Sequence, residues 1–216
     1  MLDEILRLPN GAHFYRADLH THTPADPGFH HGRFNTTTTE EKRDLARAYV
    51  KFLHEEQQID IVAITDPNDV GWIKYIQEAA AELYPHTLTI FPGVELGANE
   101  GKRQVHFLAL FNPNTNPDHI DHFISSLGLL PHNPRQLTQR IVSGQDGLPG
   151  LPIAAHATRK NGLLHELEGE GRVLAYEDPN LIALEIPGTR TELSNFVQRL
   201  VNGEENHYGY KSVACL

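Results

Sequence analysis

Two histidines separated by one threonine, His20 and His22, end an apolar segment in the stretch ADLHTHTPAD of this 216-residue chain. If residues 14–22 form a strand, the alternation of side chains places Asp18, His20 and His22 on one face. Two imidazoles on the face of an apolar strand are costly unless something binds them. The pattern therefore predicts a binding site at the carboxyl end of a first strand.

Later apolar segments also carry an ionisable residue within them or at their ends. These residues are Asp66, Glu95, His106, His156 and Glu185. Taken singly, each has an ordinary structural explanation, such as a turn former, a hydrogen-bonded core histidine or a member of an ion pair. Taken together, they predict a shared rim, because active sites of α/β barrels are built at the carboxyl ends of the strands. Imidazole and carboxylate ligands without thiolate suit zinc, manganese or iron.

The elements that must position these residues alternate between strands and helices. Apolar runs predict strands at residues 14–22, 59–65, 88–96, 105–111, 151–157, 181–187 and 211–216. Helical spacing and cap residues predict helices that begin near residues 36–39, 73, 116, 133 and 193. This alternation indicates an α/β protein with a mostly parallel sheet, either a barrel or a doubly wound fold. A Rossmann fold would need a glycine-rich turn after the first strand, where this chain has histidines.

The composition narrows the class of protein further. The chain has a net charge of −10 and a single cysteine, Cys215, so a disulfide framework and a thiolate metal cage are both excluded within it. The charge argues against a broad basic surface for duplex nucleic acid, although bound cations can reverse the charge of a local site. No apolar run reaches the roughly 20 residues of a membrane helix, and no signal peptide is visible. We therefore expect a cytoplasmic protein that forms one domain over residues 1–216.

Four motifs of the chain resemble, in the same order, those of the PHP (polymerase and histidinol phosphatase) superfamily of metal-dependent phosphoesterases. The motifs are DLHTHT (18–23), AITDPN (63–68), PGVEL (92–96) and AAHA (154–157). The resemblance runs from about residue 15 to the end of the chain. It implies a distorted TIM-like (β/α)7 barrel that holds two or three divalent metal ions. Carried over by position, the metal ligands would be His20, His22, Asp26, Glu95, His106 and His156.

The chain departs from the family pattern at two places. The second motif has Pro67 where the family usually has a histidine, and His30 or His31 could substitute for that ligand. The Asp-x-His pair that the family places after its last strand is absent before Leu216. We therefore expect residues 1–216 to be the N-terminal fragment of a longer chain, weakly active alone. Among PHP proteins, the chain looks most like the modules fused ahead of ATPase modules, which makes an ATPase module a possible partner.

The expected activity is metal-dependent hydrolysis of a phosphomonoester or phosphodiester, with Asp66 and Arg159 as catalytic residues. Arg159 follows His156 closely and could bind the phosphate, although a solvated basic residue at the start of a helix is an equal alternative. The substrate could be a nucleic acid, a nucleotide or a small ester. Two alternatives stay open, a catalytically impaired scaffold or regulatory module and an amidohydrolase-like barrel. The second would require a lysine on the fourth strand, which carries His106 instead.

Overall fold

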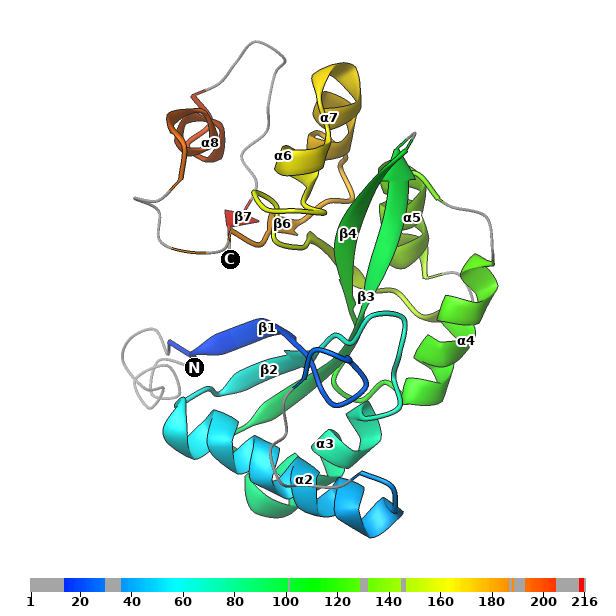
Figure 1. Ribbon diagram of the computed structural model, residues 1–216, viewed down its shortest axis with the longest axis vertical. Helices are drawn as coiled ribbons and strands as arrows, with labels where there is room; N and C mark the ends of the chain where they lie inside the picture. The colour runs from blue at the N-terminus through cyan, green and yellow to red at the C-terminus, as the bar shows by residue number, and fades with distance from the viewer. Residues whose placement is uncertain are drawn as a thin grey trace, which may run out of the picture.

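Seven strands form one sheet in the computed structural model, which describes residues 14–29, 36–100, 102–128, 132–144, 147–186, 188, 193–204 and 214–215. The strands follow one another across the sheet in sequence order (Figure 1). They are β1 (Ala17–Thr21), β2 (Ile61–Ile64), β3 (Thr89–Glu100), β4 (Arg103–Leu110), β5 (Leu151–Ala154), β6 (Ala183–Leu184) and β7 (Ala214–Cys215). His30 and His31 lie outside the described residues.

The sheet is a curled, open half-barrel, which agrees with the expected distorted TIM-like (β/α)7 barrel in class and strand order but is not closed. β4 runs antiparallel to both of its neighbours, whereas the other neighbouring strands are parallel. The physical reason is the short connection between Glu100 and Arg103. A parallel pair needs a crossover of a dozen or more residues, and a tight hairpin can only join antiparallel strands.

Helices cover the outer face of the half-barrel. They are α2 (Thr39–Lys51), the π-helix η1 (Phe52–Glu56), α3 (Ile73–Leu83), α4 (Pro117–Leu127), α5 (Pro134–Ser143), α6 (Leu163–Glu166), α7 (Gly169–Tyr176) and α8 (Asn195–Val201). In Figure 1, α2 and α3 lie below β1 to β3, and α4 and α5 flank β3 and β4. No helix among these described residues is long and apolar enough to span a bilayer.

Local sequence signals explain where several helices begin. Thr38 caps α2 in a reciprocal capping box with Glu41. Asn116 and Asn133 cap α4 and α5, and each is followed by a proline at the first helical position. Proline is favoured there because its missing N–H has no intrahelical partner in any case.

Side-chain alternation along the strands separates the outer core from the inner face. Val94 and Leu96 pack into the outer core against the helices, and so do Val105 and Phe107 of β4. Glu95 therefore points to the opposite, inner side of the sheet, as does His106. The inner face carries its own small apolar cluster, which includes Ala63, Leu108 and Ile153. The sheet thus places the polar residues of two strands on the concave side.

Candidate metal centre

Glu95 lies at the centre of a cluster of four histidines. Its side chain is 7% exposed, and its Oε1 is 2.7 Å from Nδ1 of His106 and 3.2 Å from Nε2 of His156. Its Oε2 is 3.7 Å from Nε2 of His20 and 4.0 Å from Nε2 of His22. One carboxylate therefore faces two pairs of imidazoles, one pair at each oxygen.

An irregularity in β1 brings both His20 and His22 to the cluster. Asp18 pairs with Val62 and Thr21 with Ile64, so three steps along β1 match two steps along β2. Such a β-bulge changes the direction in which the following side chains point. The rings of His20 and His22 lie edge to face, with centroids 4.9 Å apart. Simple alternation predicted the right pair of residues but not the bulge.

Glu185 holds His20 and the backbone of His156 together. Its Oε2 is 2.7 Å from Nδ1 of His20 and accepts a hydrogen bond of 2.8 Å from the backbone N–H of His156. A carboxylate on the outer nitrogen of a histidine fixes the ring orientation and leaves the other nitrogen for a ligand. Glu185, which the sequence placed only at the common rim, therefore connects β1 to the turn after β5.

Asn161 is a member of the site that sequence reasoning missed. Its Nδ2 is 3.2 Å from Nε2 of His106, and its backbone carbonyl accepts a 2.8 Å hydrogen bond from the N–H of His106. It adopts a left-handed backbone conformation, with φ of 63°. The Asn-Gly dipeptide at residues 161–162 is a turn signal, and asparagine tolerates this conformation better than most residues.

His156 stands at a sharp turn where β5 ends. Its φ is 30°, a conformation that non-glycine residues rarely adopt. Non-glycine residues held in such conformations cluster at functional sites. The ring of His156 lies 5.3 Å from that of His106 and 5.8 Å from that of His20, measured between centroids.

Two further acidic residues, Asp26 and Asp66, lie on the other side of the His22 ring from Glu95, near its Nδ1. Oδ2 of Asp26 is 3.7 Å and Oδ1 of Asp66 is 3.8 Å from Nδ1 of His22. Asp66 is fully buried, and both of its oxygens accept hydrogen bonds from Thr23, from the N–H at 2.7 Å and from the hydroxyl at 2.6 Å. Burial raises the pKa of Asp66 and outweighs the opposing effect of Thr23. Pro67, in the second motif, forms a backbone bridge with Glu95.

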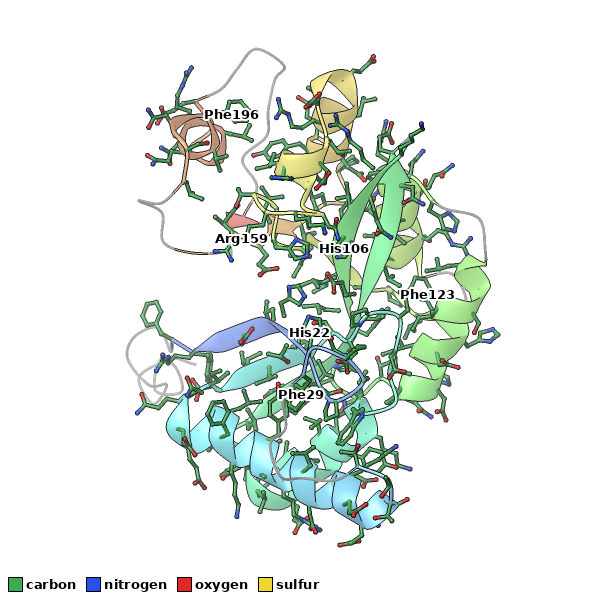
Figure 2. All side chains as sticks on the ribbon, viewed as in Figure 1. His22, Phe29, His106, Phe123, Arg159 and Phe196 are labelled. Carbon is green, nitrogen blue, oxygen red and sulfur yellow. The ribbon has the colours of Figure 1, made fainter. Side chains whose placement is uncertain are left out.

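Arg159 lies just beyond the cluster rather than within it. Its backbone N–H donates to the carbonyl of His156, and its side chain is exposed (Figure 2). Of the eight residues that the sequence singled out as ligands or catalytic groups, the structure thus brings Glu95 and the four histidines together. Asp26 and Asp66 adjoin this group through His22, and Arg159 stands outside it.

The charges in the cluster are strongly coupled. Burial alone would raise the pKa of Glu95, but hydrogen bonds from His106, His156 and His20 outweigh it and hold that pKa well below its usual range. Burial alone would lower the pKa of His20, but Glu185 and Glu95 raise it to about 9. Burial also opposes the ionised form of Glu185, and His20 overcomes it to lower the pKa. The cluster therefore keeps Glu95 and Glu185 ionised and favours the protonated, positively charged form of His20.

The donor set fits divalent metal ions. Two groups have ligand atoms that all lie within 4.8 Å of one another, His20–His22–Glu95 and Glu95–His106–His156, and Glu95 belongs to both. Nε2 of His20, Nδ1 of His22 and Nδ1 of His156 are buried without a hydrogen-bond partner. Buried polar atoms without partners are rare, and an ion that coordinates here is one explanation of such an atom.

Comparison with known proteins supports the fold. No family model matches the sequence, and no curated protein sequence matches it. The structure is similar to a provisionally assigned metal-dependent phosphoesterase from Bifidobacterium adolescentis, with a TM-score of 0.52 and 16% identity over 79% of this chain and 77% of that one. An amidohydrolase from Chromobacterium violaceum with bound sulfate and no metal aligns with a TM-score of 0.49 and 15% identity over 87% and 84% of the two chains. At these identities the first similarity shows a shared fold, and the second is too low to carry an argument.

Proposed function

We propose that this protein is a metal-dependent phosphoesterase with a two-metal site. The observation that carries the proposal is the position of Glu95, which belongs to both candidate donor groups. A carboxylate shared between two ions is suited to hold them at the short separation of about 3.5–4 Å that two-metal hydrolases use. Bound ions would polarise the phosphoryl oxygens and lower the pKa of the attacking water.

The residues of the chain divide into ligands and supports. His20, His22, His106 and His156 would provide the remaining ligands around Glu95, in accord with the resemblance to PHP proteins. Asp26 would provide a ligand only to the ion that His22 binds, because its carboxylate lies near the ring of His22. In the hydrolysis, the oxygen of water bonds to phosphorus, the ester P–O bond breaks, and the departing alcohol oxygen takes a proton.

Arg159 and Asp66 would serve in different ways. The exposed guanidinium of Arg159 would neutralise charge on the phosphoryl group, since arginine binds phosphate in a bidentate manner. Asp66 is buried with both oxygens bonded to Thr23, so it would position the segment that follows His22 rather than touch the substrate.

The test combines metal content with hydrolysis. We expect the purified chain to bind two Mn²⁺ ions and to hydrolyse bis-p-nitrophenyl phosphate or p-nitrophenyl phosphate. Glu95→Gln should lower the rate by about 100-fold or more and the Mn²⁺ content by at least one ion, because a neutral amide is a poor metal ligand. Inductively coupled plasma mass spectrometry and the release of nitrophenolate are the two readouts.

Glu100→Gln is the matched control, because Glu100 lies on the same strand and is exposed. It should leave both readouts unchanged. Metal bound without hydrolysis of either ester would favour the scaffold alternative, and a wild-type chain that binds no metal would refute the metal site itself.

A further inference from the structure

A cavity lies beside the turn that carries His156. It has a volume of about 590 Å³, is open to solvent on one side, and is lined by the turn after β5, by α6 and by the start of α8. This volume lies in the range of small-molecule sites. The described residues that line it are Leu164, Leu193, Phe196, Val197, Thr158, Arg159, His165 and Ser194.

Backbone hydrogen bonds connect this cavity rigidly to the candidate metal centre. The carbonyl of Ala157 accepts from the N–H groups of Leu164 and His165, at 2.8 and 3.2 Å, and the carbonyl of His156 accepts from the N–H of Arg159 at 2.8 Å. The walls of the cavity therefore start from the same turn that carries His156. A larger cavity of about 1080 Å³ lies beside α3. No residue of the histidine cluster lines either cavity, but the smaller one includes Thr158 and Arg159, which follow His156 in the same turn.

The lining divides into an apolar part and a cationic part. Leu164, Leu193, Phe196 and Val197 provide the apolar part, and Arg159 provides the positive charge. Among the residues that the structure describes, no carboxylate pairs with the guanidinium of Arg159, so it is available to an anion. Phe196 is held by Arg172, whose guanidinium carbon lies 5.1 Å from the ring centroid. A cation over an aromatic face is an attractive contact that orients the ring.

We propose that this cavity, defined by Arg159 and Phe196, binds the alcohol portion of the phosphate ester and selects an apolar, ring-bearing group. The inference rests on the proposed function, which places the phosphoryl group at the metal centre. Arg159 would contact the phosphoryl group where the two sites meet, and the ring of the alcohol would pack on Phe196. The preferred substrates are therefore phosphate esters of aromatic or cyclic alcohols rather than of small polar ones.

The test uses two phosphonates that cannot be hydrolysed, phenylphosphonate and methylphosphonate, titrated into the full chain with Mn²⁺ by calorimetry. The wild-type chain should bind phenylphosphonate at least about tenfold more tightly, because burying the phenyl ring removes apolar surface from water. Phe196→Ala should reduce this ratio to about two or less. Arg159→Ala should weaken both phosphonates by a similar factor and leave their ratio intact, because both carry the same anion.

Two variants separate binding from folding. Phe196→Leu keeps an apolar side chain in the partly buried position and should give an intermediate ratio with an unchanged melting temperature. Leu174→Ala removes a 43% exposed apolar side chain of α7 that does not line the cavity, and it should change nothing.

The outcomes distinguish this inference from the function on which it rests. Equal affinity for the two phosphonates in an active enzyme, or an unchanged ratio in a folded Phe196→Ala variant, would overturn the cavity assignment alone. If neither phosphonate binds and no ester is hydrolysed, both the cavity assignment and the phosphoesterase proposal are wrong.

Discussion

The amide of Asn161 contacts Nε2 of His106, and each of its two orientations matches a different tautomer of that ring. In one orientation, Nδ2 of Asn161 donates to Nε2 of His106, so the proton of the ring is on Nδ1, which faces Glu95. If the amide turns over, its oxygen accepts from an Nε2–H instead, and the lone pair on Nδ1 becomes available to a metal ion. Contacts of this kind beyond the ligands tune metal sites as strongly as some ligands do.

We predict that Asn161→Gly weakens metal binding by about 10- to 100-fold, the range typical for loss of such a partner. Glycine keeps the left-handed backbone conformation and the backbone hydrogen bonds, so the melting temperature should change little. Metal titration and thermal melts measure the two effects separately. Gln58→Gly, at an exposed position with φ of 57°, is the control and should leave metal affinity unchanged. Equal affinities in Asn161→Gly and wild type would mean that the amide does not orient His106.

At the scale of elements, the turn after β5 and the start of α6 fit together closely. A Cβ added to Gly162 would lie 2.2 Å from the carbonyl oxygen of His156 and 2.6 Å from that of Ala157. These are backbone atoms, so no side chain can move aside to make room. The glycine thus lets α6 approach the turn that presents His156.

Gly162→Ala should therefore destabilise the protein by about 1–3 kcal/mol and weaken metal binding, because His156 must shift. Gly171→Ala is the control, since its Cβ would meet only the Glu100 side chain at 3.6 Å or more within α7. That change should be neutral or slightly stabilising, as alanine is favoured over glycine inside a helix. Urea unfolding and metal titration of both variants check the prediction, and similar results for the two would contradict it.

Helix α2 is stabilised by its capping box. The carboxylate of Glu41 accepts hydrogen bonds from the hydroxyl of Thr37 and from the N–H and hydroxyl of Thr38. These bonds lower the pKa of Glu41 from its ordinary value of 4.5 to about 2. Since the pKa is depressed in the folded state, this stabilisation is present above pH 4.5 and is lost as the pH falls towards 2.

We predict that Thr38→Ala lowers the free energy of unfolding near neutral pH by about 1 kcal/mol, the usual cost of losing an N-cap. The difference between wild type and variant should become smaller between about pH 4.5 and pH 2 as Glu41 protonates. Urea unfolding at several pH values measures this difference. A difference that stays constant or grows in acid would show that Glu41 does not cooperate with the cap.

At the scale of the whole molecule, the candidate metal ligands come from distant parts of an open sheet. His20 lies on β1, Glu95 and His106 lie on β3 and β4, and His156 follows β5. Bound ions would therefore tie these strands together across the concave face. Any ligand that binds only the folded state stabilises it, by an amount that grows with the logarithm of the ratio of ligand concentration to dissociation constant.

Mn²⁺ at about 100 times its dissociation constant should add about 2.7 kcal/mol to the free energy of unfolding. For a chain of this size, that corresponds to a rise of roughly 5–10 °C in the melting temperature. The double variant His20→Ala with His22→Ala should lose this rise, whereas His86→Ala with His119→Ala, at exposed positions, should retain it. A rise of equal size in both double variants would place the stabilising ion elsewhere.

The sequence alone determined the order of the strands, the longer helices and most of the candidate site, but not α6 and α7. Periodicity predicted every strand of the sheet in its correct place, and Asn-Pro pairs predicted the starts of α4 and α5. It also singled out His20, His22, Glu95, His106 and His156, because an ionisable side chain in an apolar strand is conspicuous without any knowledge of its neighbours. These are local properties of the chain, and local properties are readable from residue types and spacing.

Only the tertiary structure decided how those residues meet. The bulge in β1, the pairing of β4 with β5 and the contact between Asn161 and His106 depend on segments far apart in the chain. So do the contact between Glu185 and His20 and the cavity between α6 and α8. A pattern of residue types does not specify the register in which strands pair. That register and the geometry of the turns determine which face of the sheet a side chain occupies and how far it lies from its neighbours. The identity of the candidate ligands is thus a property of the sequence, whereas the sharing of Glu95 between two groups of histidines is a property of the fold.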